Sequence, residues 1–152
     1  VITTPGEATV EKRGIYLMEW YMELDNRVFT ILKTKLNKKL KTKYADLYIT
    51  DSDINSSVPS FPNVYFHVLG GIEVGKDLEQ TSVNGILFNV QVEVSSKKQV
   101  DTKLVMSEVL SIFKGMAFEI VTMPEFNNQD NVYRQVARLR RVIGQNDVPS
   151  LK

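Results

Sequence analysis

The chain has 152 residues, of which 43% are hydrophobic and 24% charged, a composition typical of one globular domain and unlike that of a disordered chain. It contains no cysteine, which excludes a disulfide framework and a thiolate metal site. A formal net charge of +1 gives no overall attraction to polyanions, and no apolar run approaches the ~20 residues of a membrane span.

Residues 1–24 are expected to form an N-terminal arm. Their first part, "VITTPGEATVEKRG", combines proline, glycine and mixed charge, and it lacks the apolar stretch of a signal peptide. The next segment, "IYLMEWYM", is dense in large apolar side chains and could begin a helix or dock the arm elsewhere.

A helix is predicted from Asp25 onward, because apolar side chains recur at three- and four-residue steps. The apolar row consists of Leu24, Val28, Ile31, Leu32, Leu36 and Leu40. A second set of side chains, all lysines, lies outside this row: Lys33, Lys35, Lys38, Lys39, Lys41 and Lys43. We interpret the lysines as a solvated helix face; the alternative is a surface that faces the phosphates of passing DNA.

The middle of the chain changes to the two-residue period of strands. Strands are predicted at 46–50, at 63–69 and at 84–96, and Gly70 and Gly71 are expected to end the second of them. In the third, the alternation from Ile86 to Val94 indicates a half-buried strand. Polar loops are predicted at 51–62 and 72–82.

In the last third of the chain, the sequence predicts a helix and then a hairpin. Asp101 is the expected N-cap of the helix, and Gly115 lies near its end. Strands follow at 118–123 and 132–143, joined by a turn, and residues 148–152 form a polar tail outside a domain of 25–147. The order α-β-β-β-α-β-β predicts an α+β fold with a mostly antiparallel sheet of about five strands and two helices on one face. The face of the sheet without helices must then be exposed to water or covered by a partner.

The last predicted strand, "VYRQVARLRRVI", contains four arginines. In a strand, Arg134, Arg138 and Arg140 share one face and Arg141 lies on the other, whereas a helix would align Arg134, Arg138 and Arg141. The preceding turn favours the hairpin. A solvated sheet face is the simplest interpretation, and charge-assisted pairing with carboxylates across an interface is the functional one. A nucleic-acid site would need stacking aromatics or a loop that follows phosphates, and neither is evident.

No pattern in the sequence indicates catalysis or metal binding. His67 is the sole histidine and lies in an apolar strand, so we expect a core or sheet-surface residue. No serine and acid accompany it at a recognisable spacing, and the glycines form neither GxGxxG nor a phosphate loop. We therefore expect no enzyme activity, no cofactor and no metal. The connection "GGIEVGKDLEQTSVNG" is long and should project from the sheet as the main docking element.

Several of these segments resemble the tail terminator, or tail-completion, proteins of long-tailed bacteriophages. The resemblance runs from about Asp25 to Asp147 and includes the helices "DNRVFTILKTKL" and "DTKLVMSEVLSIFKGMAF". It rests mainly on "SVPSFPNVYFHVLGG", "IEVGKDLEQTSVNGILFNVQVEVSS" and "MPEFNNQDNVYRQVARLRRVIGQND".

The resemblance implies a structural virion protein that is not an enzyme and needs no cofactor. Such proteins form a ring, commonly six-fold, at the head-proximal end of the tail tube, where they stop tube polymerisation and join the tail to the neck or head connector. The implied partners are other copies of the chain, the tail tube protein and a connector protein. Genomic DNA would pass through the lumen without sequence-specific binding. The implied location is the virion, after assembly in the host cytoplasm, and no membrane is involved.

In such a ring, Arg134, Arg138, Arg140 and Arg141 are candidate interface residues that would face a neighbouring subunit or the lumen. Charge complementarity alone suggests acidic partners for them in the long loop, namely Glu73, Asp77 and Glu79. Two alternatives remain open. One is a head-completion or neck connector protein that contacts the portal, and the other is a small nucleic-acid-binding module that uses the lysine helix and the arginine strand.

Overall fold

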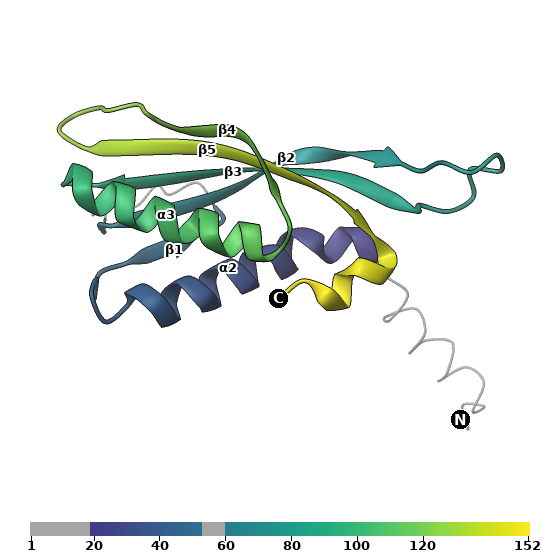
Figure 1. Ribbon diagram of the computed structural model, residues 1–152, viewed down its shortest axis with the longest axis horizontal. Helices are drawn as coiled ribbons and strands as arrows, with labels where there is room; N and C mark the ends of the chain where they lie inside the picture. The colour runs from purple at the N-terminus through teal and green to yellow at the C-terminus, as the bar shows by residue number, and fades with distance from the viewer. Residues whose placement is uncertain (1–18, 53–59) are drawn as a thin grey trace, which may run out of the picture.

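The computed structural model describes residues 19–52 and 60–152, which form one twisted sheet covered on one side by two helices (Figure 1). The elements, in chain order, are η1 (Trp20–Glu23), α2 (Leu24–Leu40), β1 (Tyr48–Thr50), β2 (Asn63–Val74), β3 (Gly85–Ser96), α3 (Gln99–Gly115), β4 (Glu119–Phe126), β5 (Tyr133–Gly144) and η2 (Gln145–Ser150), where η denotes a 3-10 helix. The predicted α+β class and element order are confirmed.

The sheet has the strand order β1-β2-β3-β5-β4, with β1 parallel to β2 and every other pair antiparallel. Strand β3 is central, and its alternation places Val90, Val92 and Val94 in the core. The intervening Gln91 and Glu93 face the opposite side, because successive side chains of a strand point to opposite faces. The sheet is therefore apolar towards the helices, and the middle of its other face is polar.

Both helices bury one apolar row against the sheet. Helix α2 buries five residues at four-residue steps: Leu24, Val28, Leu32, Leu36 and Leu40. Helix α3 buries Phe113, whose ring lies 6.4 Å from that of Phe66 and 5.1 Å from that of Phe118, measured between centroids. These aromatic contacts join α3 to the sheet at the centre of the core.

The start of α3 differs from the prediction. Asp101 is not the N-cap, because the helix already begins at Gln99 and Lys98 precedes it without a side-chain cap. The Asp101 carboxylate lies in the first turn, where negative charge is favoured by the helix dipole. It accepts a hydrogen bond of 2.9 Å from the hydroxyl of Tyr44. Asp101 therefore ties the segment after α2 to the beginning of α3.

This tie makes the stability of the fold sensitive to alkaline pH. Burial, together with the hydrogen bond to Asp101, raises the pKa of Tyr44 from 10.0 to about 12. Because the folded-state pKa is above the unfolded one, the contribution of the neutral phenol is fully present below about pH 10 and is lost as the pH rises towards 12. We expect Tyr44→Phe to be less stable by about 0.5–1.5 kcal/mol at neutral pH and to lose less stability on going above pH ~10.

Urea unfolding of both proteins across this pH range measures the difference, since the two proteins differ only in the Tyr44 hydroxyl. Parallel curves of unfolding free energy against pH would contradict the role assigned to the Tyr44 phenol.

Strand β2 is longer than predicted. Gly70 and Gly71 do not end it; the strand continues to Val74 and pairs with β3 throughout. Gly70 has a φ of +99° at a β-bulge that lies between Val68 and Gly70. Glycine adopts this conformation without a Cβ clash, so the chain bends at the bulge and the ladder resumes. The loop is thus shortened to residues 75–84, and the β2–β3 hairpin extends beyond the helices (Figure 1).

The folded part of the chain also reaches past both predicted limits. At the C-terminus, residues 148–152 are not a free polar tail, because η2 includes 145–150 and Leu151 is only 2% exposed in the core. At the other end, η1 and the buried Leu24 belong to the folded unit rather than to an arm. Residues 1–18 of the predicted arm and residues 53–59 of a predicted loop lie outside the described residues.

Candidate assembly surfaces

The face of the sheet opposite the helices is not covered by any element of residues 19–52 or 60–152 (Figure 1). Its middle is a row of polar side chains from neighbouring strands, because residues that are directly opposite in a ladder face the same side. His67 of β2, Gln91 of β3, Arg138 of β5 and Thr122 of β4 form one such row.

The arginines of β5 lie as the strand interpretation predicts. Arg134, Arg138 and Arg140 are on the uncovered face, while Arg141 points to the helix side. The guanidinium of Arg141 donates a hydrogen bond of 2.8 Å to the carbonyl of Met116, just after α3. Arg141 thus fixes the end of α3 to the sheet, and its role in an interface stays a prediction.

The three arginines of the uncovered face already have partners within the chain. Arg134 forms an ion pair with Glu93 of β3, and Nε of Arg140 lies 3.0 Å from Oε2 of Glu119 of β4. Nε of Arg138 donates a 3.0 Å hydrogen bond to the amide oxygen of Gln91. The pairing of these arginines with Glu73, Asp77 and Glu79 of another subunit stays a prediction, and it would have to be made beside these intramolecular contacts or in place of them.

His67 lies exposed on the same face, and its Nδ1 is 2.9 Å from the hydroxyl of Tyr65. This is one of the two positions expected from the sequence, a sheet-surface residue. Within the described residues, no group of three or more histidines, aspartates and glutamates is close enough to hold a metal ion. No helix in the same part of the chain is both long and apolar enough to cross a membrane.

The hairpin tip, residues 75–84, is held by its own hydrogen bonds. The backbone N–H of Gln80 donates to Oδ1 of Asp77 over 2.6 Å, and Nδ2 of Asn84 donates to the carbonyl of Gly75 over 2.7 Å. Leu78 lies between Asp77 and Glu79 and is fully exposed. The tip therefore presents an apolar side chain flanked by two carboxylates.

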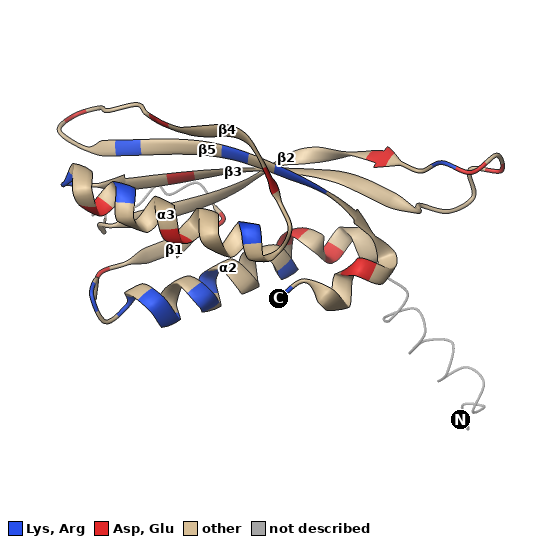
Figure 2. Ribbon diagram, in the orientation of Figure 1, with Lys and Arg blue, Asp and Glu red and all other residues tan. Residues whose placement is uncertain are grey.

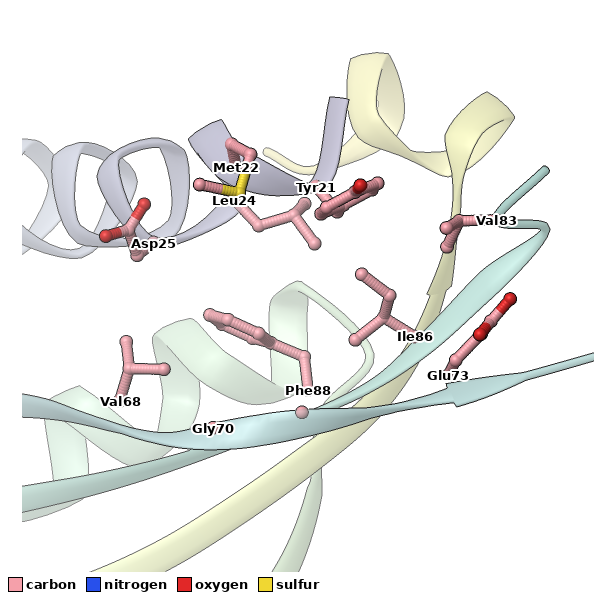
Figure 3. A pocket seen from close by; sticks show the side chains of 11 residues that line it. Tyr21, Met22, Leu24, Asp25, Val68, Gly70, Glu73, Val83, Ile86 and Phe88 are labelled. Atoms are coloured by element: carbon pink, nitrogen blue, oxygen red, sulfur yellow. The ribbon is translucent and has the colours of Figure 1, made fainter. Parts of the chain in front are cut away.

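Glu73 lies apart from the tip, on the helix side of the hairpin. It borders an open groove of about 460 Å³ between the hairpin base and the start of α2 (Figure 3). The groove is apolar inside, where Tyr21 and Leu24 face Ile86 and Phe88, and the carboxylates of Asp25 and Glu73 lie at its margin. This chemistry suits an apolar group and disfavours an acidic one.

A second open groove, of about 470 Å³, lies between α2 and α3. Lys35, Lys38 and Lys39 border it from α2, and Ser111, Ile112 and Gly115 line it from α3. Ile112 is almost completely buried at its base, and a side chain added to Gly115 would meet no atom within 4 Å. The groove is thus apolar at its base and positively charged along one wall; we call it the lysine groove.

The charge of this wall is only partly neutralised. Nζ of Lys39 lies 3.2 Å from Oε2 of Glu108, an ion pair outside hydrogen-bonding geometry. Among the described residues, Lys35 and Lys38 form no ion pair. The position of the lysines outside the leucine row is confirmed, but the sequence contained no signal that three of them border a groove. That groove exists only because α3 packs beside α2.

Neither a protein-family model nor a curated protein matches the sequence. The function of these surfaces must accordingly be inferred from their shape and charge.

Proposed function

We propose that the protein is a structural virion component that forms a ring at the head-proximal end of a phage tail tube. There it stops tube polymerisation and joins the tail to the neck or head connector. The observation that supports this role best is the β2–β3 hairpin, which extends well beyond the two helices and ends in a fully exposed leucine.

The hairpin is a poor fit to a protein that acts alone. Besides Leu78, it exposes Ile72, at 63%, and Leu69, at 45%. Single exposed apolar residues are normal, but several on one projecting two-stranded element are an aggregation liability that a partner would remove. In a protein that functions in an assembly, a neighbouring subunit or another virion protein can cover these apolar side chains.

The uncovered sheet face fits the same role. Glu93 and Glu119 neutralise Arg134 and Arg140, so this face carries little unpaired positive charge. If it lines the lumen, DNA can pass along it without being retained, since tight phosphate binding needs several unneutralised cations. If it faces the tube or the connector, the same ordered polar side chains supply hydrogen bonds.

Imaging of particles that lack this protein tests the proposal. We expect negative-stain images to show over-long tails, because tube growth would not be terminated. Tails of normal length beside separate, DNA-filled heads would instead support the alternative, a head-completion or neck connector protein. Normal particles with tails of normal length would overturn both.

A nucleic-acid-binding module is the second candidate, and the lysines of α2 are the observation that favours it. It predicts tight binding to duplex DNA with a steep dependence on salt, whereas the ring proposal predicts weak binding. A filter-binding titration at two salt concentrations separates the two.

A further inference from the structure

We infer that the hairpin tip of one copy binds the lysine groove of the next copy. Leu78 would enter the apolar base of the groove, and Asp77 and Glu79 would pair with its lysines. The inference rests on the proposed ring function and assigns to it the contact between neighbouring subunits.

The first argument is apolar complementarity. Leu78 is fully exposed on an internally hydrogen-bonded tip, so its side chain is presented to a partner at little cost in loop ordering. The lysine groove offers Ile112 at its base and free space above Gly115. Placing the leucine there removes its own apolar surface from water.

The second argument is charge. The carboxylates of Asp77 and Glu79 flank Leu78, and Lys35 and Lys38 lie about one helical turn apart beside the groove. A leucine inserted between the two helices would therefore bring carboxylates close to ammonium groups that have no ion-pair partner among the described residues. Such complementary charges guide encounter and fix the register of an interface.

The other two surfaces fit the tip less well. The groove at the hairpin base carries Asp25 and Glu73, which would repel an acidic tip. On the uncovered sheet face, Arg134 and Arg140 already pair with Glu93 and Glu119, which leaves Arg138 as the one arginine of that face without an ion pair among the described residues. The lysine groove combines unpaired positive charge with an apolar base.

The arrangement makes the contact intermolecular and head-to-tail. The tip lies at the far end of the hairpin, away from the lysines of α2, which Figure 2 shows in blue along the lower helix. Two different patches on each copy therefore meet, and repetition of such a contact closes into a ring when the rotation between copies allows it.

Two charge-reversal variants of the full chain test the contact. The tip variant carries Glu79→Lys, which keeps the Asp77 hydrogen bond that holds the tip, and the groove variant carries Lys35→Glu and Lys38→Glu. Glu79 and Lys38 are exposed, and Lys35 is half-buried. By light scattering after size exclusion, we expect the wild type to form an oligomer. The oligomer of each variant should dissociate at a protein concentration at least about tenfold higher than that of the wild type. Leu78→Ala should weaken assembly by about 10- to 100-fold without changing any charge.

Mixing provides the decisive measurement. The tip variant and the groove variant should restore the oligomer when combined. The wild-type tip of the groove variant can bind the wild-type groove of the tip variant, and the reversed tip can bind the reversed groove. Arg138→Glu, a reversal on the uncovered face, tests the competing prediction that Arg138 contacts a neighbouring subunit; if the lysine groove is the contact, this variant should assemble like the wild type.

Three outcomes would overturn the inference. They are unimpaired assembly of the tip and groove variants, loss of assembly only in Arg138→Glu, and a wild type that stays monomeric at its highest soluble concentration. Loss of DNA binding rather than of assembly in the groove variant would likewise reassign the groove to nucleic acid. None of these outcomes alters the tail-length experiment, so a wrong contact and a wrong function can be told apart.

Discussion

Phe113→Ala is expected to lower the free energy of unfolding by about 3–5 kcal/mol. The Phe113 side chain is completely buried and lies between the rings of Phe66 and Phe118, with centroid distances of 6.4 and 5.1 Å. Truncation leaves a cavity between α3 and the sheet, and the surrounding rings can fill it only in part. Urea unfolding followed by circular dichroism measures the change.

Val100→Ala is the matched control for this prediction, since Val100 lies on the same helix but is 72% exposed. Its effect should stay within about 0.5 kcal/mol. A loss below about 1 kcal/mol for Phe113→Ala would be incompatible with the central place of this ring in the core.

Leu151→Ala should lower the free energy of unfolding by about 2–5 kcal/mol, although the residue is the second from the end of the chain. The expected effect is large because η2 returns the chain to the core, where Leu151 is 2% exposed. The same denaturation experiment applies. Lys152→Ala, at the exposed neighbouring position, should be neutral within about 0.5 kcal/mol.

Equal stability of Leu151→Ala and wild type would mean that residues 148–152 behave as the polar tail that the sequence predicts. The prediction of a tail arose because a single leucine among polar residues has no periodicity. Local pattern cannot report the burial of one side chain by distant elements.

In the β2–β3 hairpin, the sequence correctly indicated an unusual backbone conformation at glycine but wrongly predicted that the strand ends there. The Gly70-Gly71 pair indicates a backbone irregularity, and Gly70 indeed has a positive φ. Its effect, however, is a bulge inside a strand, because β3 continues to pair with residues 70–74. Whether glycine ends or bends a strand depends on the partner strand, which lies elsewhere in the sequence.

For the arginines of β5, the sequence correctly predicted the face on which each side chain lies but not its contacts. Alternation alone predicted that Arg134, Arg138 and Arg140 share a face and that Arg141 does not, as observed. Their contacts with Glu93, Gln91 and Glu119 were not predicted, because they depend on β5 lying between β3 and β4.

The amino-acid order by itself determined which segments are helices or strands and which side of each is apolar. Both are local properties, set by steric preferences and by the 3.6- and two-residue periods of the backbone. Only the tertiary structure decided what surrounds the side chains outside the core. Arg134 and Arg140 pair with carboxylates, three lysines of α2 border a groove, and Leu78 is exposed to water. These surroundings follow from strand order and helix packing, which are set by burial of the whole core at once.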